Sequence, residues 1–128
     1  MQMRLEVYDD VAMLFHSEEK DILLVQHMIE NLFFVKKIVR MKLDLSLYQL
    51  LQNHPCEHLA NVIDFSCSYE KTILIEEFVN GCTLEYKLSQ RKLCIEELIG
   101  IMLQLFAVVE HLHALTPPVI HRDIKPDN

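Results

Sequence analysis

The segment 95–115 limits what this chain can fold into more than any other, because it predicts a long helix with apolar residues on nearly all sides. Apolar residues recur along one stripe at helical spacing; they are Leu98, Met102, Leu105, Val109 and Leu112. Apolar residues at positions 99, 101, 106 and 108 widen that stripe beyond the width of a surface helix. A helix with this pattern needs packing partners on several sides. Where a partner is missing, the helix leaves an apolar patch that favours association.

The same segment predicts no membrane span, because its most apolar part, 98–109, is shorter than a bilayer requires and lies between glutamates. Residues 1–10 are mixed and acidic, so no secretory signal is expected there. The four cysteines, at 56, 67, 82 and 94, form no C-x-x-C pair, which favours reduced thiols over a disulfide framework or a zinc site. We therefore expect a cytoplasmic protein.

Composition narrows the class of partner. The chain of 128 residues is 51% apolar and 24% charged, as globular domains are. Its net charge of −7 argues against binding to a nucleic-acid backbone. A site for nucleotide phosphates needs only a few local lysines, so the acidic total does not count against nucleotide binding.

The rest of the chain alternates between strand and helix patterns. Strand character is found in the segments 5–15, 21–27, 32–39, 61–66 and 72–78. Helical spacing is found in 42–52, which His54-Pro55 ends, in 83–88 and in 95–115. The predicted order is therefore three strands, a helix, two strands in a hairpin, and two helices. This order indicates the α+β class.

The last eight residues, His121 to Asn128, read HRDIKPDN and combine groups that can carry out chemistry. A carboxylate such as Asp123 can accept the proton of an incoming hydroxyl. Five residues later, Asn128 offers an amide oxygen of the kind that binds Mg²⁺. Pro126 stiffens the loop between them.

This octapeptide resembles the catalytic loop of Ser/Thr protein kinases, H-R-D-x-x-x-x-N, with every motif position filled. A polar tail that spells the motif by chance is the alternative, and the match over the whole loop argues against it. The resemblance implies phosphoryl transfer from ATP to a protein hydroxyl, with Asp123 as base and Asn128 as a Mg²⁺ ligand. It also implies that Lys125 steadies the transferring phosphate and that Arg122 binds a phosphorylated activation loop.

The order of elements is similar to that of a kinase small lobe followed by the start of the large lobe. The resemblance implies an antiparallel five-stranded sheet with one helix in residues 1–79. Residues 80–128 would then hold the end of the hinge, the first helices of the large lobe and the catalytic loop. A D-F-G segment and an activation loop should follow Asn128. We therefore expect an N-terminal portion of a kinase that alone is inactive.

The third strand should carry the lysine that binds the α and β phosphates, and Lys36 and Lys37 compete for this role. Side chains alternate along a strand, so only one of the two can face the nucleotide. With Lys37 facing it, Val35 lies above the adenine; with Lys36 facing it, the bulky Phe34 does. This steric argument favours Lys37. A solvated lysine pair is the alternative.

In the family, a glutamate on the following helix holds that lysine, and this chain has none there. Asp44 is the only acid of the segment 42–52, and we expect it to take this role. In another register Ser46 occupies the position and the lysine is unpaired. A third possibility is that Asp44 serves only at the N-terminus of the helix.

Residues 74–84, LIEEFVNGCTL, resemble the hinge between the lobes. The resemblance implies that backbone groups from Glu77 to Val79 bind adenine and that Glu76 occupies the gatekeeper position behind it. Gly81 would ease the turn. An apolar strand that simply ends in a turn is the alternative.

The chain departs most from the family at the phosphate-covering loop, which normally reads G-x-G-x-x-G. The matching residues 15–20, FHSEEK, contain no glycine, and two glutamates add negative charge. Ser17 and Lys20 are the groups that could substitute. Two alternatives to an active protein kinase follow: a pseudokinase-like binding module, and a small-molecule phosphotransferase. The second usually lacks the equivalents of Arg122 and Lys125.

Overall fold

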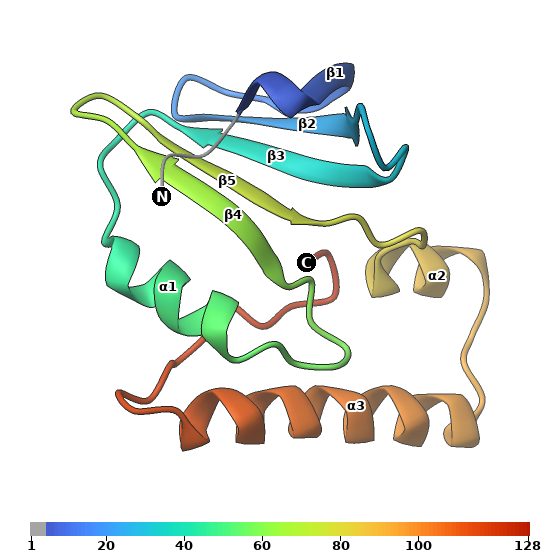
Figure 1. Ribbon diagram of the computed structural model, residues 1–128. Coiled ribbons are helices and arrows are strands. Elements are labelled where there is room, and N and C mark those ends of the chain that lie inside the picture. The colour runs from blue at the N-terminus through green and yellow to red at the C-terminus, as the bar shows by residue number, and fades with distance from the viewer. Residues whose placement is uncertain (1–4) are drawn as a thin grey trace. The chain divides into compact units, whose positions relative to one another are not determined.

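The computed structural model describes residues 5–128. Its strands are β1 (Tyr8–His16), β2 (Lys20–His27), β3 (Phe33–Val39), β4 (Val62–Cys67) and β5 (Thr72–Glu77). Its helices are a 3-10 turn, η1 (Leu5–Val7), and α1 (Leu45–Asn53), α2 (Leu84–Gln90) and α3 (Ile95–Ala114). Figure 1 shows their order along the chain. The predicted α+β class is confirmed.

The chain divides into two compact units, which are described separately. The first comprises residues 1–55 and 60–79, and the second comprises 56–59 and 80–128. The first unit holds one five-stranded sheet in the order β1-β2-β3-β5-β4, with antiparallel neighbours throughout. This confirms the predicted antiparallel five-stranded sheet. In the observed strand order, β5 lies between β3 and β4.

The core of the first unit lies on β2 and β5, the strands with the most buried residues. Val25 and Ile75 are fully buried, and Leu23, Ile73 and Leu74 are nearly so. Burial of such side chains contributes about 1.5–3 kcal/mol each. Strand β1, at the edge of the sheet, is exposed along most of its length. The centre of the sheet is therefore its rigid part, and β3, which carries both candidate lysines, lies there.

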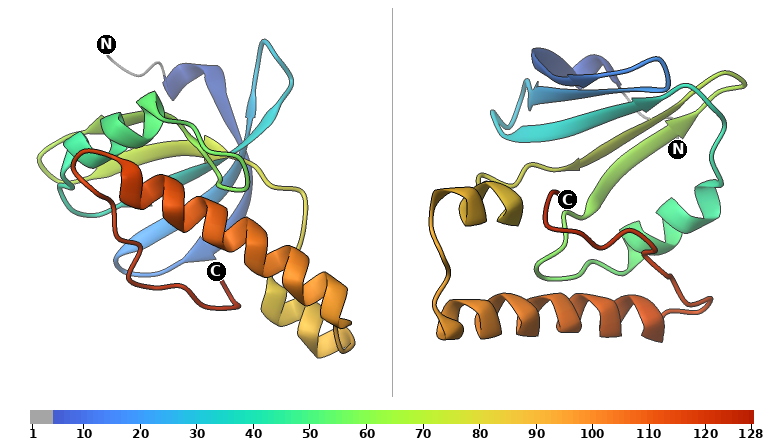
Figure 2. Two further views of the ribbon diagram at one scale, coloured as in Figure 1. Left: turned by 90° about the horizontal axis from the view of Figure 1, so that it is seen from below. Right: turned by 180° about the vertical axis from the view of Figure 1, so that it is seen from behind.

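Helix α1 contacts the sheet through β4 (Figure 2). The rings of Tyr48 and Phe65 lie 6.3 Å apart at this contact. The segment before the helix is fixed by Thr72, whose buried hydroxyl donates to the Met41 carbonyl (2.9 Å) and accepts from the Leu43 N–H (3.0 Å). The start of α1 is therefore tied to the start of β5.

In the second unit, side chains fix the start of each helix. The Thr83 hydroxyl accepts from the N–H of Tyr86 (3.2 Å) at the start of α2. At the start of α3, the Glu97 carboxylate accepts from the Cys94 N–H (3.1 Å) and pairs with Arg91 at 2.5 Å. The hydrogen bond from Arg91 is the main cause that lowers the pKa of Glu97 to about 2.

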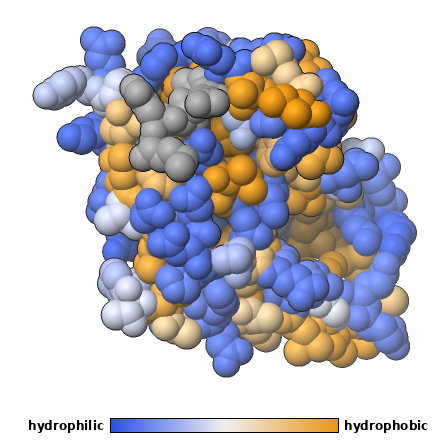
Figure 3. Space-filling model, viewed as in Figure 1, coloured by the Kyte–Doolittle hydropathy of each residue, from blue (hydrophilic) through white to orange (hydrophobic). Residues whose placement is uncertain are grey.

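Helix α3 buries only part of its apolar surface. Val108 and Leu112 are buried, as is Leu115 just after the helix. Six other apolar side chains are exposed; they are Ile95, Leu98, Ile99, Met102, Leu103 and Phe106. Figure 3 shows hydrophobic side chains along part of this helix. We call these six residues the α3 patch. Within residues 5–128, no helix combines the length and the hydropathy that a bilayer span needs.

Candidate nucleotide-binding and catalytic site

The two lysines of β3 lie on opposite faces of the sheet and each has its own carboxylate. Lys37 Nζ lies 2.6 Å from Glu76 Oε2 on the neighbouring strand β5. Lys36 Nζ pairs with Asp10 Oδ1 of β1. Because side chains alternate along a strand, the two lysines form separate ion pairs, one on each face of the sheet.

The strand register shows that Lys37 shares its face with α1. Lys37 is paired with Leu74, and Leu74 with Phe65, so the three side chains point to the same side. Phe65 is the residue that contacts Tyr48 of the helix. Val35, two residues before Lys37, lies on this face as well. The arrangement supports Lys37 over Lys36, and the choice of lysine remains a prediction.

Asp44 lies at the N-terminus of α1, where it caps the helix. Its carboxylate accepts from the N–H of Ser46 at 2.9 Å, and this hydrogen bond lowers the pKa of Asp44. The predicted ion pair with the lysine is absent from the contacts of the described residues, in which Lys37 pairs with Glu76. The aspartate side chain is occupied by the helix terminus, which explains the difference.

The predicted hinge residues begin at Glu77, the last residue of β5. Glu77 Oε2 accepts from both the N–H and the side-chain amide of Asn61 at 3.0 Å, and the Glu77 N–H donates to the Asn61 carbonyl (3.0 Å). Phe78 packs against Phe33, with ring centroids 6.5 Å apart, and Val79 is exposed. The side chain of Glu77 therefore anchors the strand end to the residue before β4. The predicted contacts of its backbone with adenine stay a prediction.

The turn between β1 and β2 occupies the position of the phosphate-covering loop. The Ser17 hydroxyl accepts from the N–H groups of Glu19 (3.3 Å) and Lys20 (3.1 Å). The Ser17 N–H donates to the Lys20 carbonyl (2.9 Å). A phosphate cradle needs backbone N–H groups directed at the anion. Here these donors are used within the turn itself.

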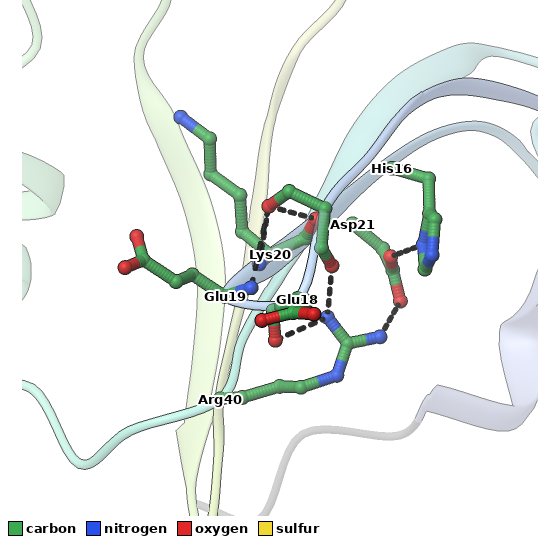
Figure 4. Close-up of polar contacts among 7 residues, drawn as sticks. His16, Glu18, Glu19, Lys20, Asp21 and Arg40 are labelled. Carbon is green, nitrogen blue, oxygen red and sulfur yellow. Dashed lines mark hydrogen bonds and ion pairs between the residues drawn. The ribbon is translucent and has the colours of Figure 1, made fainter.

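Arg40, the residue after β3, fastens this turn (Figure 4). The backbone N–H of Arg40 donates to the Glu19 carbonyl (2.9 Å), and its guanidinium donates to the Ser17 carbonyl (2.9 Å). The guanidinium also pairs with the Asp21 carboxylate at 2.6 Å, and His16 Nδ1 lies 2.6 Å from the other oxygen of that group. The hydrogen bond with His16, with Arg40 in addition, lowers the pKa of Asp21.

Sequence reasoning missed Arg40 because its partners lie about twenty residues earlier. One signal was available: two neighbouring antiparallel strands were predicted, and their ends carry opposite charges at Asp21 and Arg40. Pairing those ends would have placed the two residues close together.

The predicted catalytic residues lie together in the second unit. Asn128 Nδ2 donates to the Asp123 carbonyl (2.5 Å) and lies 3.3 Å from its carboxylate. Lys125 Nζ lies 3.8 Å from the Asp123 carboxylate and 3.5 Å from that of Asp127. The Pro126 carbonyl accepts from the Glu85 N–H of α2 at 2.8 Å, which anchors the loop.

The loop's donor set fits a magnesium ion and a phosphate. Because the amide nitrogen of Asn128 is directed at Asp123, its oxygen lies on the other side of the group, as a metal ligand would require. The backbone of Arg122 is left-handed, with φ 67°, an uncommon conformation that turns the chain just before Asp123. One short loop thus brings a carboxylate and an ammonium group together and carries an amide oxygen that faces away from them.

The antiparallel sheet with a helix against it, followed by two helices, is the architecture of a kinase small lobe and the start of a large lobe. A family model described as the protein kinase domain matches residues 10–128. The chain therefore belongs to the protein kinase family.

Individual relatives are protein kinases from plants, fungi and bacteria. The chain is 30% identical over 94 residues to the probable serine/threonine-protein kinase WNK6 of Oryza sativa subsp. japonica, covering 73% of this chain and 21% of that protein. It is 37% identical over 73 residues to actin-regulating kinase 1 of Saccharomyces cerevisiae, covering 56% and 11%. It is 41% identical over 56 residues to the serine/threonine-protein kinase PknA of Nostoc sp., covering 43% and 10%. The chain thus spans about a fifth or less of the length of these relatives.

Proposed function

We propose that this protein is a cytoplasmic Ser/Thr protein kinase that transfers the γ-phosphoryl group of ATP to a protein hydroxyl. Residues 1–79 supply the nucleotide-binding lobe, and residues 80–128 supply the end of the hinge and the catalytic loop. The single observation that carries the proposal is the cluster of Asp123, Lys125 and Asn128 in a loop anchored to α2. Similarity to proteins named serine/threonine-protein kinases supports the choice of substrate hydroxyl.

Each residue has a role that follows from its chemistry. Asp123 accepts the proton of the substrate hydroxyl, and Lys125 neutralises charge on the transferring phosphoryl group. Asn128 holds Mg²⁺, and Lys37 holds the α and β phosphates. When bound, Mg²⁺-ATP supplies the reactive phosphoryl group. Backbone groups of Glu77 and Val79 orient the adenine.

The chain by itself is not expected to phosphorylate a protein. Phosphoryl transfer in this family also uses the aspartate of a D-F-G segment, and the sequence of 128 residues contains no such segment. The test of catalysis therefore belongs in a protein in which this chain is joined to the rest of a kinase domain.

In that protein, Asp123→Asn removes the proton acceptor and should lower turnover by at least about 100-fold. Its melting temperature should stay unchanged, because the Asp123 side chain is 67% exposed. Asp127→Asn is the matched control, since it neutralises another acid of the same loop and should leave turnover within a few-fold. Turnover of the Asp123 variant close to that of the unmodified protein would sink the assignment.

A second function, a binding module without catalysis, is favoured by one specific observation. The N–H groups of Glu19 and Lys20 are already hydrogen-bonded within the β1–β2 turn. Calorimetric titration with Mg²⁺-ATP separates the two functions when it is paired with a turnover assay. Nucleotide binding with turnover supports the kinase, whereas the absence of turnover, with or without nucleotide binding, supports the module.

A further inference from the structure

We propose that Glu76 is the positioning residue of Lys37, so that a strand supplies the carboxylate that the family normally takes from a helix. The inference rests on the proposed function, because it assigns Lys37 to the phosphates of ATP. It goes beyond that function by naming the residue that directs the lysine and the element from which this residue comes.

The register of β3 and β5 places the two side chains together. Val35 is paired with Glu76, and Lys37 with Leu74, so Lys37 and Glu76 are diagonal neighbours on one face. Their charged atoms lie 2.6 Å apart. The side chains are largely shielded, at 35% exposure for Lys37 and 15% for Glu76. This shielding makes the pair less subject to screening than a surface ion pair.

Three other acids of this unit are engaged elsewhere. Asp44 caps α1 through the Ser46 N–H, and Asp10 pairs with Lys36 on the opposite face of the sheet. Glu77 is hydrogen-bonded to Asn61. Among the described residues, Glu76 is the acid that the contacts assign to Lys37.

The surroundings of Glu76 connect it to the helix side of the sheet. Burial is the main cause that raises the pKa of Tyr48 in α1, and the negative charge of Glu76 adds to it. The carboxylate of Glu76 therefore acts on the same face that carries Lys37, Phe65 and Val35. On this face Lys37 of β3 is held by a carboxylate of β5, the strand that is hydrogen-bonded to β3.

The consequence concerns how the lysine is kept in place. In the family the acid is on the helix, so the ion pair forms only when the helix lies close to the sheet. Here both partners belong to adjacent strands of one rigid sheet. The orientation of Lys37 should then be independent of where α1 lies.

The test compares two ligands that differ only in the phosphates. Mg²⁺-ATP requires Lys37, whereas adenosine does not. Glu76→Gln keeps the size of the side chain, so it should weaken Mg²⁺-ATP binding by about tenfold or more, the scale of one charge-assisted hydrogen bond, and weaken adenosine binding much less. Glu76→Asp, which keeps the charge, should restore part of the affinity. Asp10→Asn is the matched control, because it breaks the ion pair of the other β3 lysine.

A chemical readout follows the ion pair itself. The rate at which an amine-acylating reagent modifies Lys37, measured by mass spectrometry, should rise in Glu76→Gln and not in Asp10→Asn.

Three outcomes would overturn this proposal alone. Tighter Mg²⁺-ATP binding in Glu76→Gln would mean that Glu76 withholds the lysine from the phosphates. Equal loss of affinity for both ligands would mean that Glu76 is only structural. Unchanged affinity in Glu76→Gln, together with loss of binding in Lys37→Met, would leave the kinase function standing and remove Glu76 from it. Failure of the unmodified protein to bind Mg²⁺-ATP would instead overturn the proposed function and this inference together.

Discussion

At the scale of single residues, each lysine of β3 has a defined electrostatic partner. Lys36 and Lys37 are adjacent in sequence, yet Asp10 and Glu76 hold them on opposite faces of the sheet. The sequence alone could not show which carboxylate binds which lysine. Alternation of side chains along the strand establishes only that the two lysines lie on opposite faces. The partner of Lys37 comes from a neighbouring strand, β5, which lies more than thirty residues further along the chain.

The register leads to a prediction for the two lysines. Lys37→Met should cripple phosphoryl transfer in the protein that carries this chain, because it removes the cation from the face shared with α1. Lys36→Met should have a smaller effect, since it removes a side chain from the other face. Steady-state turnover and the affinity for Mg²⁺-ATP are the measurements. The reverse order of effects would assign the nucleotide to the face of Lys36.

At the scale of elements, the sequence predicted the strands and helices well, because alternation and helical spacing are local patterns. The helix predicted over 95–115 is found at Ile95–Ala114, and the strand over 21–27 at Lys20–His27. The helix predicted over 42–52 begins at Leu45 instead, because Asp44 caps it. The fastening of the β1–β2 turn by Arg40 could not be predicted, since it depends on strand register.

The start of α3 should be sensitive to acid. The pKa of Glu97 is lowered to about 2 from its ordinary value of 4.5, chiefly by Arg91. A carboxylate with a lowered pKa stabilises the folded state above its unfolded pKa, and this contribution disappears as the pH falls from about 4.5 toward about 2. Glu97→Gln should therefore lower the melting temperature at pH 7 and flatten its fall below pH 4.5.

The control for this prediction is Glu110→Gln, which neutralises an exposed acid elsewhere on the same helix. Thermal melts followed by circular dichroism at several pH values provide the measurement. A fall of equal steepness in the unmodified chain and in Glu97→Gln would assign the acid sensitivity to other groups.

At the scale of the whole molecule, the α3 patch governs how the chain behaves in solution. Its six apolar side chains are exposed, and Leu103 and Phe106 are about 60% exposed. Exposed apolar surface of this kind drives association in water. The sequence predicted this property from the width of the apolar stripe.

The chain of 128 residues should therefore self-associate as its concentration rises. The double variant Leu103→Glu with Phe106→Glu should shift it toward the monomer, because it places two charges in the patch. Sedimentation velocity over a range of concentrations is the measurement, with Tyr69→Glu as a control at another exposed position, in the turn between β4 and β5. A monomeric unmodified chain at high concentration would contradict the prediction.

The fastened turn between β1 and β2 changes how nucleotide affinity divides between enthalpy and entropy. A flexible glycine-rich loop loses conformational entropy when it closes on phosphates and gains new hydrogen bonds in return. The turn that holds Ser17 and Glu19 is already ordered by its own hydrogen bonds and by those from Arg40. It therefore has little conformational entropy left to lose and few backbone donors left for phosphates. Nucleotide binding by this chain should then draw its enthalpy from side-chain cations, and weaken with rising salt more steeply than a backbone cradle would allow.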